Sequence, residues 1–120
     1  MNAAALDCAV RGRSRLAEAS FELANGEIER ACESGWNAAE LLFTAIADER
    51  GWQRDVHRHF YDIATRLDEE LDDMDIHALL ACAGQLRHSS DFLAADMVGY
   101  CLVKVAELVA CIQSMLTEPD

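Results

Sequence analysis

The chain has 120 residues, with 22 acidic side chains against 10 basic ones and a formal net charge of −12. This length fits one domain, and a sequence that is 52% hydrophobic and 27% charged can bury a core, unlike a disordered chain. Six glycines and one proline leave little material for turns, which argues against a β-sandwich or barrel. The acidity argues against generic DNA binding, which needs a surplus of Lys and Arg.

The first two helical segments are expected at about 3–32 and 34–50. Asn25-Gly26 interrupts the first segment, which is therefore either one bent helix or two pieces, and residues 1–12 read as an Ala-rich helical extension with a frayed end. Ser34 is suited to cap the second segment and Gly51 to end it. The expected apolar faces are Phe21, Ala24, Ile28 and Ala31 in the first segment, and Trp36, Ala39, Phe43 and Ile46 in the second.

Three more helical segments are expected at about 54–71, 75–90 and 94–116. Their expected apolar residues are Val56, Phe60, Ile63, Leu67 and Leu71 in the third, and Ile76, Leu79, Leu80, Ala83 and Leu86 in the fourth. The fifth is the most hydrophobic and has two apolar faces, one with Leu93, Met97, Tyr100, Lys104, Leu108, Ile112 and Met115, the other with Val98, Leu102, Val105 and Val109. Such a helix contacts more than one neighbour, either within a bundle or in a second subunit.

The segments are joined by short linkers, which place consecutive helices antiparallel to one another. The sequence also contains neither an internal repeat nor a low-complexity tract. We therefore predict a single all-α domain over residues 1–120, built as an antiparallel up-and-down bundle of four to five helices.

The five cysteines are odd in number, irregularly spaced and without a Cys-x-x-Cys pair. This pattern predicts neither a disulfide framework nor a zinc knuckle, and most of the cysteines are expected to be small buried residues. Residues 1–10 do not have the pattern of a signal segment, and no run approaches the ~20 apolar residues of a membrane span. A cytoplasmic protein that does not enter a membrane is the expectation.

The sequence lacks the catalytic and metal-binding motifs that helical bundles use. No Glu or Asp is followed three residues later by His, so a di-iron centre is not predicted. A His-x-x-x-His pair, a Gly-rich phosphate loop and a Ser-centred nucleophile elbow are also missing. We expect neither a metal nor a cofactor.

The negative charge is concentrated in residues 62–75. This stretch holds seven acidic side chains against Arg66 alone, a net −6 and half of the charge of the whole chain. The spacing and central Gly of an EF-hand are missing, so a solvated helix end with its loop is favoured over a Ca²⁺ site. Docking of a basic protein on this stretch is the remaining functional reading, and His77 beside it is expected to be structural.

A basic cluster surrounds Trp52. It consists of Arg50, Arg54, Arg58, His57 and His59. The arginines are four residues apart and share one face of a helix, and a guanidinium beside an aromatic ring suits a phosphate or a base. Arg54, His57 and His59 are therefore candidate ligand-binding residues. The alternative is that the cluster pairs with nearby acids.

A second polar cluster, Arg87-His88-Ser89-Ser90-Asp91-Phe92, ends the fourth segment. Arg87 and Asp91 are four residues apart and lie on one helix face. An arginine here suits a phosphate, and His88 beside it suits acid–base chemistry, which makes Arg87, His88 and Asp91 candidate ligand-binding residues and the first two the catalytic candidates. The alternative is an Arg87–Asp91 ion pair with Ser and Asp capping the helix.

Two stretches of the sequence resemble the HEPN superfamily. The run Ala31-x-Glu33-x-x-Trp36, continued by Ala38, Ala39, Leu41, Leu42 and Ala45 up to Gly51, resembles a helix of its small members that is rich in Ala and aromatic residues. In those proteins a Gly and a short loop lead to a His that opens the next helix, as Gly51 leads to His57 here. The cluster from Arg87 to Phe92 is similar to the Arg-x-x-Ala-Asp-Tyr signature of stand-alone members. The resemblance covers about residues 16–116.

The resemblance implies an antiparallel bundle that is often a homodimer, with the motif helices near a cleft between the subunits. Members include RNases with an Arg-x4–6-His motif, noncatalytic nucleotide binders, and partners of nucleotidyltransferases in toxin–antitoxin pairs. The motif arginine falls on Arg87, but its final position falls on Phe92, where nuclease members have His. The literal Arg-x4-His of this chain, Arg54 to His59, lies in the wrong helix.

We therefore expect a noncatalytic, dimeric HEPN-like module. Its ligand is a nucleotide or RNA at a local basic site, or its partner is a protein such as a nucleotidyltransferase. One alternative is a metal-independent endoribonuclease that uses Arg87 with His88, His57 or His59 in place of the missing histidine. A second alternative is an acidic structural adaptor that docks a basic protein.

Overall fold

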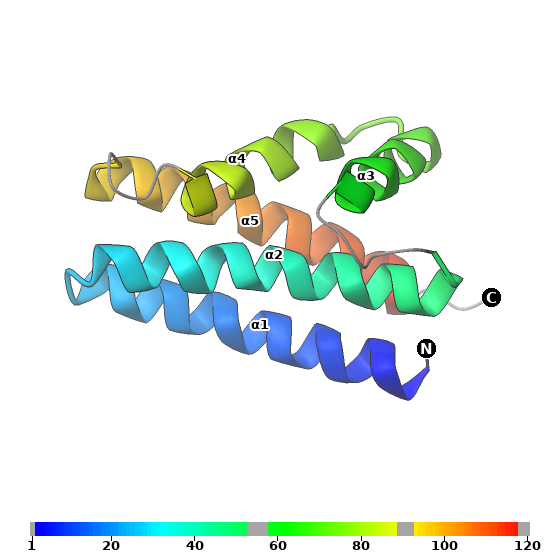
Figure 1. Cartoon of the computed structure of the whole chain (residues 1–120), viewed down its shortest axis with the longest axis horizontal. Helices are drawn as coiled ribbons and strands as arrows, with labels where there is room; N and C mark the ends of the chain where they lie inside the picture. The colour runs from blue at the N-terminus through cyan, green and yellow to red at the C-terminus, as the bar shows by residue number, and fades with distance from the viewer. Residues whose placement is uncertain (1, 53–57, 89–92, 118–120) are drawn as a thin grey trace.

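The computed structural model describes residues 2–52, 58–88 and 93–117, which form five helices and no strand. The helices are α1 (Ala3–Ala24), α2 (Ile28–Arg50), α3 (Arg58–Glu70), α4 (Ile76–His88) and α5 (Ala95–Thr117). Helices α1, α2, α4 and α5 run alternately back and forth along the 42 Å long axis of the molecule (Figure 1). The shorter α3 lies at the end where α2 stops and α4 starts (Figure 1). The predicted all-α bundle is confirmed.

The predicted boundary between the first two helices is wrong. Helix α1 ends at Ala24, and Gly26 turns the chain with a φ of 76°, which is the left-handed region that glycine adopts without strain. Helix α2 then begins at Ile28 and continues through Ser34, which is not a cap. The break at Asn25-Gly26 therefore separates two helices rather than bending one.

Ser34 and Gly35 lie in the interior of α2 for reasons that only the packing reveals. The Ser34 side chain is buried, and its hydroxyl donates a hydrogen bond to Glu22 of α1 at 2.6 Å. A Cβ on Gly35 would lie 2.6 Å from Leu102 and 2.8 Å from Leu86, so the missing side chain lets α4 and α5 pack closely against α2 here. Ser34 and Gly35, which the sequence suggested as the start of a helix, thus lie where α2 contacts α1, α4 and α5.

The N-terminal extension is part of the bundle rather than a frayed end. Asn2 caps α1 by accepting a hydrogen bond from the Ala5 backbone at 2.7 Å. Ala5, Ala9 and Gly12 are buried, and Asn2 also donates to the Asp48 carbonyl at the far end of α2. Residues 2–12 therefore belong to the core helix α1.

Most of the predicted apolar faces are buried. All the predicted core residues of the second and fourth segments are buried, as are Phe60, Ile63 and Leu67 in α3. The stripe predicted for the first segment is wrong, because the turn at Gly26 changes the direction of the chain between its members. Phe21 is 70% exposed, and only Ala31 of the four predicted residues is buried.

Helix α5 is buried along one of its two predicted apolar faces. Val98, Leu102, Val105 and Val109 all lie in the core. On the other face Leu108 and Ile112 are buried, but Met97 and Tyr100 are about half exposed. None of the helices in the described ranges has the length and hydropathy that crossing a membrane requires.

Two glycine substitutions are expected to change stability in opposite directions. A Cβ on Gly12 would overlap the Leu42 side chain and lie 3.3 Å from the Ala38 carbonyl, so Gly12→Ala is expected to destabilise the protein by about 1–3 kcal/mol. Gly84 lies in α4 with open space around it, so Gly84→Ala is expected to stabilise it by about 0.5–1 kcal/mol through helix propensity. Urea unfolding of the two variants measures both effects, and equal shifts would contradict the close α1–α2 contact.

Candidate functional site

The polar cluster predicted at the end of α4 is described in part. Asp91 lies outside the described residues, whereas Arg87 and His88 form the exposed last turn of α4. The Arg87 guanidinium lies over the ring of Trp36 in α2, with its Cζ 5.3 Å from the ring centroid. Trp36 is only 7% exposed, so Arg87 lies at the surface above a buried ring. His88 points in another direction, because neighbouring residues on a helix are about 100° apart.

The second predicted cluster forms a pocket around Trp52. Arg54 and His57 lie outside the described residues, and Arg58 is the first residue of α3. His59, in the first turn of α3, lines a pocket together with Trp52. The structure therefore brings one of the predicted ligand-binding histidines to the predicted aromatic residue.

This Trp52 pocket has a volume of about 270 Å³. It is lined by Gly51, Trp52, His59, Asp62, Ile63 and Arg66. Gly51 ends α2 with a φ of 71°, a conformation that favours glycine, and this turn leads the chain into the pocket wall at Trp52. Helix α3 supplies the other wall from one face, because its lining residues are spaced three and four apart. Arg87 does not line this pocket, so the two predicted clusters are separate in the described structure.

Two guanidinium groups lie over the Trp52 ring. The Cζ of Arg66 is 4.9 Å from the ring centroid, and that of Arg50 is 5.3 Å from it. Arg50 also forms an ion pair with Glu70. Arg66 has no ion pair within the described ranges, so its hydrogen-bond donors are available to a ligand.

Sequence reasoning missed Arg66 as a site residue, because it counted only as the single base in an acidic stretch. The spacing of residues 59–66 in a helix could have identified Arg66. His59 and Arg66 are seven residues apart and therefore lie on the same face of a helix, two turns from one another.

His59 carries an unsatisfied polar atom. Its Nδ1 is buried and has no hydrogen-bond partner in the part of the chain that the structure describes. Leaving a buried donor or acceptor unpaired costs about 1–3 kcal/mol. The pocket thus combines a cation, Arg66, and a carboxylate, Asp62, with a histidine that has an unpaired ring nitrogen.

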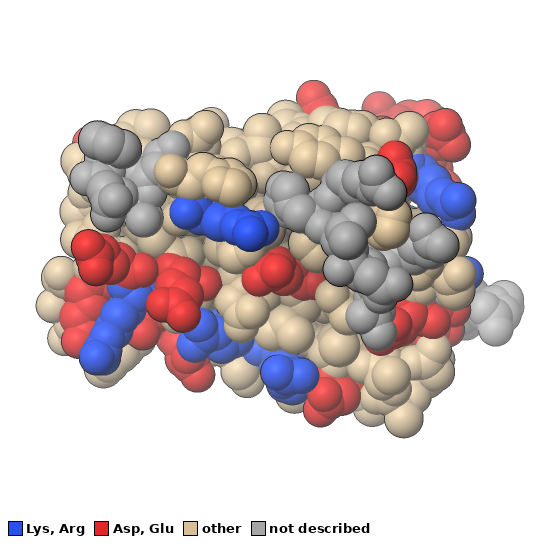
Figure 2. Space-filling view, in the orientation of Figure 1, with Lys and Arg blue, Asp and Glu red and all other residues tan. Residues whose placement is uncertain are grey.

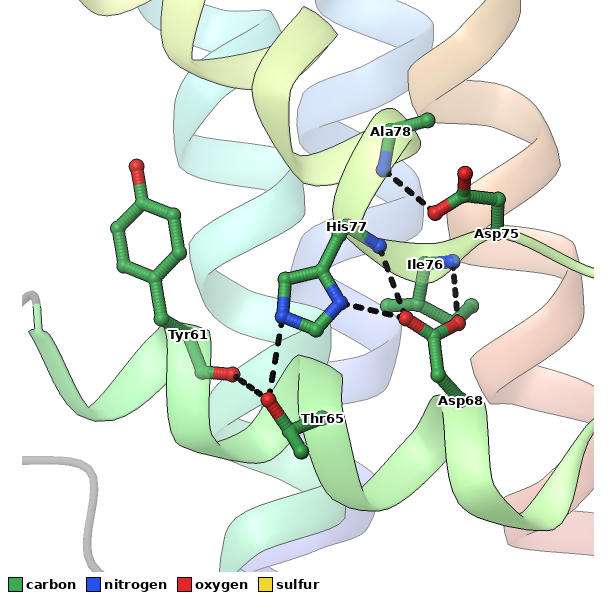
Figure 3. Close-up of polar contacts among 7 residues, drawn as sticks. All are labelled: Tyr61, Thr65, Asp68, Asp75, Ile76, His77 and Ala78. Carbon is green, nitrogen blue, oxygen red and sulfur yellow. Dashed lines mark hydrogen bonds and ion pairs between the residues drawn. The ribbon is translucent and has the colours of Figure 1, made fainter.

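The acidic stretch is held to α4 by Asp68 (Figure 3). The Asp68 carboxylate accepts hydrogen bonds from the backbone nitrogens of Ile76, at 2.6 Å, and His77, at 3.3 Å. Both N–H groups belong to the first turn of α4, where backbone N–H groups have no hydrogen-bond partner within the helix. Asp68 therefore caps α4 from the neighbouring helix α3, and this part of the acidic stretch is structural, as is His77.

Hydrogen bonds on both ring nitrogens hold His77 in place (Figure 3). The Thr65 hydroxyl donates to the Tyr61 carbonyl at 3.0 Å and also lies 3.1 Å from His77 Nε2. The His77 Nδ1 lies 2.5 Å from Asp68 Oδ2 and donates to that carboxylate. We refer to Thr65, Asp68 and His77 as the α3–α4 clasp.

Asp68, Asp75 and His77 also have ligand-type atoms within 4.8 Å of one another. Each of these side chains has a structural role. Asp75 accepts a hydrogen bond from the Ala78 backbone at 3.0 Å, and Asp68 and His77 bind one another (Figure 3). Capping of α4 accounts for the closeness of these three side chains.

The hydrogen bonds of the clasp lower the pKa of Asp68. Partial burial by itself would raise this pKa, but the bonds from the Ile76 and His77 backbones and from the His77 ring favour the carboxylate and lower it below its ordinary value. By contrast, burial raises the pKa of three thiols, those of Cys32, Cys101 and Cys111. All five cysteines are free, and those with raised pKa values remain thiols at neutral pH, as small apolar residues do.

Comparison with known proteins finds no matching family model, no matching curated protein and no matching solved structure. The functional reading therefore rests on the residues of the chain itself.

Replacing the clasp carboxylate is expected to destabilise the protein in a pH-dependent way. Because the folded-state pKa of Asp68 is lowered, its contribution is present above the ordinary pKa of aspartate, about 3.9, and is lost as the pH falls through the folded-state value. We expect Asp68→Asn to lower the free energy of unfolding by about 1 kcal/mol at pH 7. The difference from the wild type shrinks below about pH 4.

Asp72→Asn is the matched control, since Asp72 is an exposed acid in the same α3–α4 connection and the substitution removes the same charge. Urea unfolding at several pH values measures both variants. Equal destabilisation by the two substitutions would show that net charge, not the clasp, is responsible.

Proposed function

We propose that the protein is a noncatalytic HEPN-like bundle that binds a mononucleotide through the Trp52 pocket and works as a homodimer. The single observation that carries the proposal is a pocket lined by both Arg66 and His59, a histidine whose buried Nδ1 has no partner among the described residues. A cytoplasmic location, expected from the cysteine pattern and the N-terminal residues, belongs to the same proposal. So does pairing with a nucleotidyltransferase, as in toxin–antitoxin pairs, which the resemblance implies.

The charges of the pocket favour a phosphate with a polar group attached. The Arg66 guanidinium is planar and has five donors, which suits the oxygens of a phosphate. Asp62 lies one helical turn before Arg66 on the same wall and repels a phosphate, but it accepts from a ribose hydroxyl or an exocyclic amino group. A nucleotide has both kinds of group, whereas inorganic phosphate has only the first.

The size of the pocket favours one nucleotide rather than a longer ligand. Ligand pockets commonly have volumes of about 300–1,000 Å³, so about 270 Å³ accommodates a nucleotide only in part.

Arg50 and Arg66 already contact the Trp52 ring, which therefore orients these cations rather than serving as a base-stacking platform.

The distribution of charge argues against a long nucleic-acid chain. On the face drawn in Figure 2, the described Lys and Arg side chains alternate with Asp and Glu side chains. Proteins that bind single strands without sequence preference instead use a positively charged groove that follows the backbone. A local ligand suits this surface better than RNA does.

The proposal predicts nucleotide binding that depends on two pocket residues. Titration calorimetry of AMP, GMP and inorganic phosphate into the protein measures it. We expect tighter binding of a nucleotide than of phosphate, and a loss of about tenfold or more in affinity for His59→Gln and for Arg66→Gln, since each removes a bond to a charged group.

Arg30→Gln is the control, because Arg30 is an exposed arginine at the start of α2, away from this pocket. It removes the same charge and is expected to leave the affinity unchanged. Absence of binding by the wild type, or equal losses in Arg30→Gln and Arg66→Gln, would refute the pocket as a nucleotide site.

The noncatalytic part of the proposal predicts that the purified protein does not cleave RNA. Arg87 and His88 point in different directions on α4, and His59 lies in a pocket that Arg87 does not line, so neither of these two described histidines is positioned to act with the motif arginine. Incubation with RNA tests this. Cleavage that disappears in both Arg87→Ala and His88→Ala would support the endoribonuclease instead.

A further inference from the structure

A groove about 560 Å³ in volume runs between the antiparallel helices α1 and α5. Its apolar lining comes from both helices and consists of Leu16, Ala17, Ala106, Val109 and Ala110. Most of these side chains are small, so large side chains of a partner have room to enter between the two helices. We call this the α1/α5 groove.

Large apolar side chains flank the groove. Leu6 and Val10 of α1 are 50% and 44% exposed, and Val103 of α5 is 57% exposed. Helical spacing of three and four residues places them on the same faces of α1 and α5 as Ala17 and Ala106. Scattered apolar residues are normal on protein surfaces, but a contiguous patch marks an interaction site.

Beyond Ala17 the groove meets a second, acidic pocket of about 470 Å³, because Ala17 lines both. The other residues that line this second pocket are one aromatic, three acids and one base: Phe21, Glu18, Glu22, Glu27 and Arg30. Three carboxylates against one guanidinium give it a formal charge of −2. We call it the Phe21 pocket.

The Phe21 pocket offers a site for a cation. Glu18 and Glu27 form ion pairs with nearby arginines, whereas Glu22 forms no ion pair within the ranges that the structure describes and accepts a hydrogen bond from the Ser34 hydroxyl. Phe21 is 70% exposed, so its ring is accessible. An ammonium or guanidinium group gains from both an aromatic face and a carboxylate.

We infer that the α1/α5 groove and the Phe21 pocket together bind an amphipathic helix of a partner protein. The apolar side chains of this helix lie in the groove, and a Lys or Arg side chain lies in the Phe21 pocket. The stretch from Leu6 to Phe21 is about 22 Å long, roughly four helical turns. That length accommodates apolar side chains at the three- and four-residue spacing by which helices bind to hydrophobic grooves.

Charge complementarity supports a basic helix as the occupant. The chain has a formal net charge of −12, which attracts a basic segment but repels a second copy and the anionic headgroups of a membrane. Within the described lining of the groove the charged residue is Arg13, which lies at the end away from Phe21 and donates a hydrogen bond to Gln113. Arg13 therefore does not oppose a cation in the Phe21 pocket.

This surface is separate from the sites considered above. The sequence suggested docking of a basic protein on residues 62–75, but Asp68 and Asp75 of that stretch cap α4. The Trp52 pocket lies between the end of α2 and α3, and among the described helices α1 packs against α2 and α5. The inference therefore goes beyond nucleotide binding and does not depend on it.

Fluorescence anisotropy with two labelled peptides tests the inference. The first peptide has roughly four turns, with Leu residues three and four apart and Lys on the remaining positions, and the second has Glu in place of Lys. We expect the Lys peptide to bind and the Glu peptide to bind at least about tenfold more weakly, because the protein complements only the first.

Ala110→Glu tests the groove, and Ala81→Glu is its matched control. Both residues are exposed Ala positions in helices, but Ala81 lies on α4, outside the groove. Each variant adds one negative charge, which by itself favours a cationic peptide. We nevertheless expect Ala110→Glu to weaken binding about tenfold, since apolar side chains of the peptide would bury the carboxylate, and Ala81→Glu to leave it unchanged.

Glu22→Gln tests the Phe21 pocket and keeps an oxygen that accepts from Ser34. We expect it to weaken binding of the Lys peptide about fivefold, whereas Glu33→Gln, at an exposed position of α2 that lines neither pocket, has no such effect. Circular dichroism confirms that the variants keep their helices. This pair provides a second reading should Ala110→Glu fail to fold.

Three results would overturn the inference: absence of binding by the wild type, equal affinity for the two peptides, or equal affinity of Ala110→Glu and Ala81→Glu for the Lys peptide. A dimeric mass in light scattering that Ala110→Glu alone makes monomeric would instead assign the groove to a second copy. Failure here is distinguishable from failure of the proposed function, because Ala110→Glu is expected to bind AMP as the wild type does.

Discussion

Helix α2 can occupy the centre of the bundle because small side chains let α1 approach it closely. Gly12 lies against Ala38 and the side chain of Leu42, and no side chain larger than hydrogen fits at this point without a shift. Gly35 has the same role on the other side of α2, toward Leu86 and Leu102. Buried residues therefore surround α2 on most sides, and the positions of α1, α4 and α5 follow from contact with this one helix.

The Trp52 pocket depends on how α3 is held against this framework. Phe60 stacks on Phe43 of α2, with ring centroids 5.5 Å apart, and meets the edge of Trp36. At the other end of α3, the α3–α4 clasp joins Asp68 to the first turn of α4. An aromatic contact at one end and a charged cap at the other fix the helix that carries His59 and Arg66. The same interactions that stabilise the fold thus position the candidate ligand-binding groups.

Aromatic rings also organise the few basic side chains of this acidic protein. Arg50 and Arg66 lie over Trp52, Arg87 lies over Trp36, and Lys104 lies over Tyr100. In the part of the chain that the structure describes, four basic side chains therefore lie against rings, where the cation gains from the ring quadrupole. This explains how a chain with a net charge of −12 presents cations at defined places. The overall charge argues against a generic DNA-binding surface, while local contacts bring Arg50 and Arg66 together over Trp52.

The sequence by itself determined the helices, because three- and four-residue spacing of apolar side chains is a local property of the chain. It identified the break at Asn25-Gly26, the end of α2 at Gly51, and all the buried residues of α4, but only one face of α2, which is buried on several sides. It also indicated Trp52 and His59 as candidate site residues.

Only the tertiary structure decided that Ser34 and Gly35 lie inside a helix and that Phe21 faces outward, since both depend on which helices pack against these residues. The tertiary structure also decided the roles of Arg66 and Asp68. Arg66 lies over Trp52, which follows α2, and Asp68 caps α4 at Ile76, so both roles depend on contacts between different segments. A single chain specifies its own periodicity, but contacts between distant segments exist only once the helices have packed.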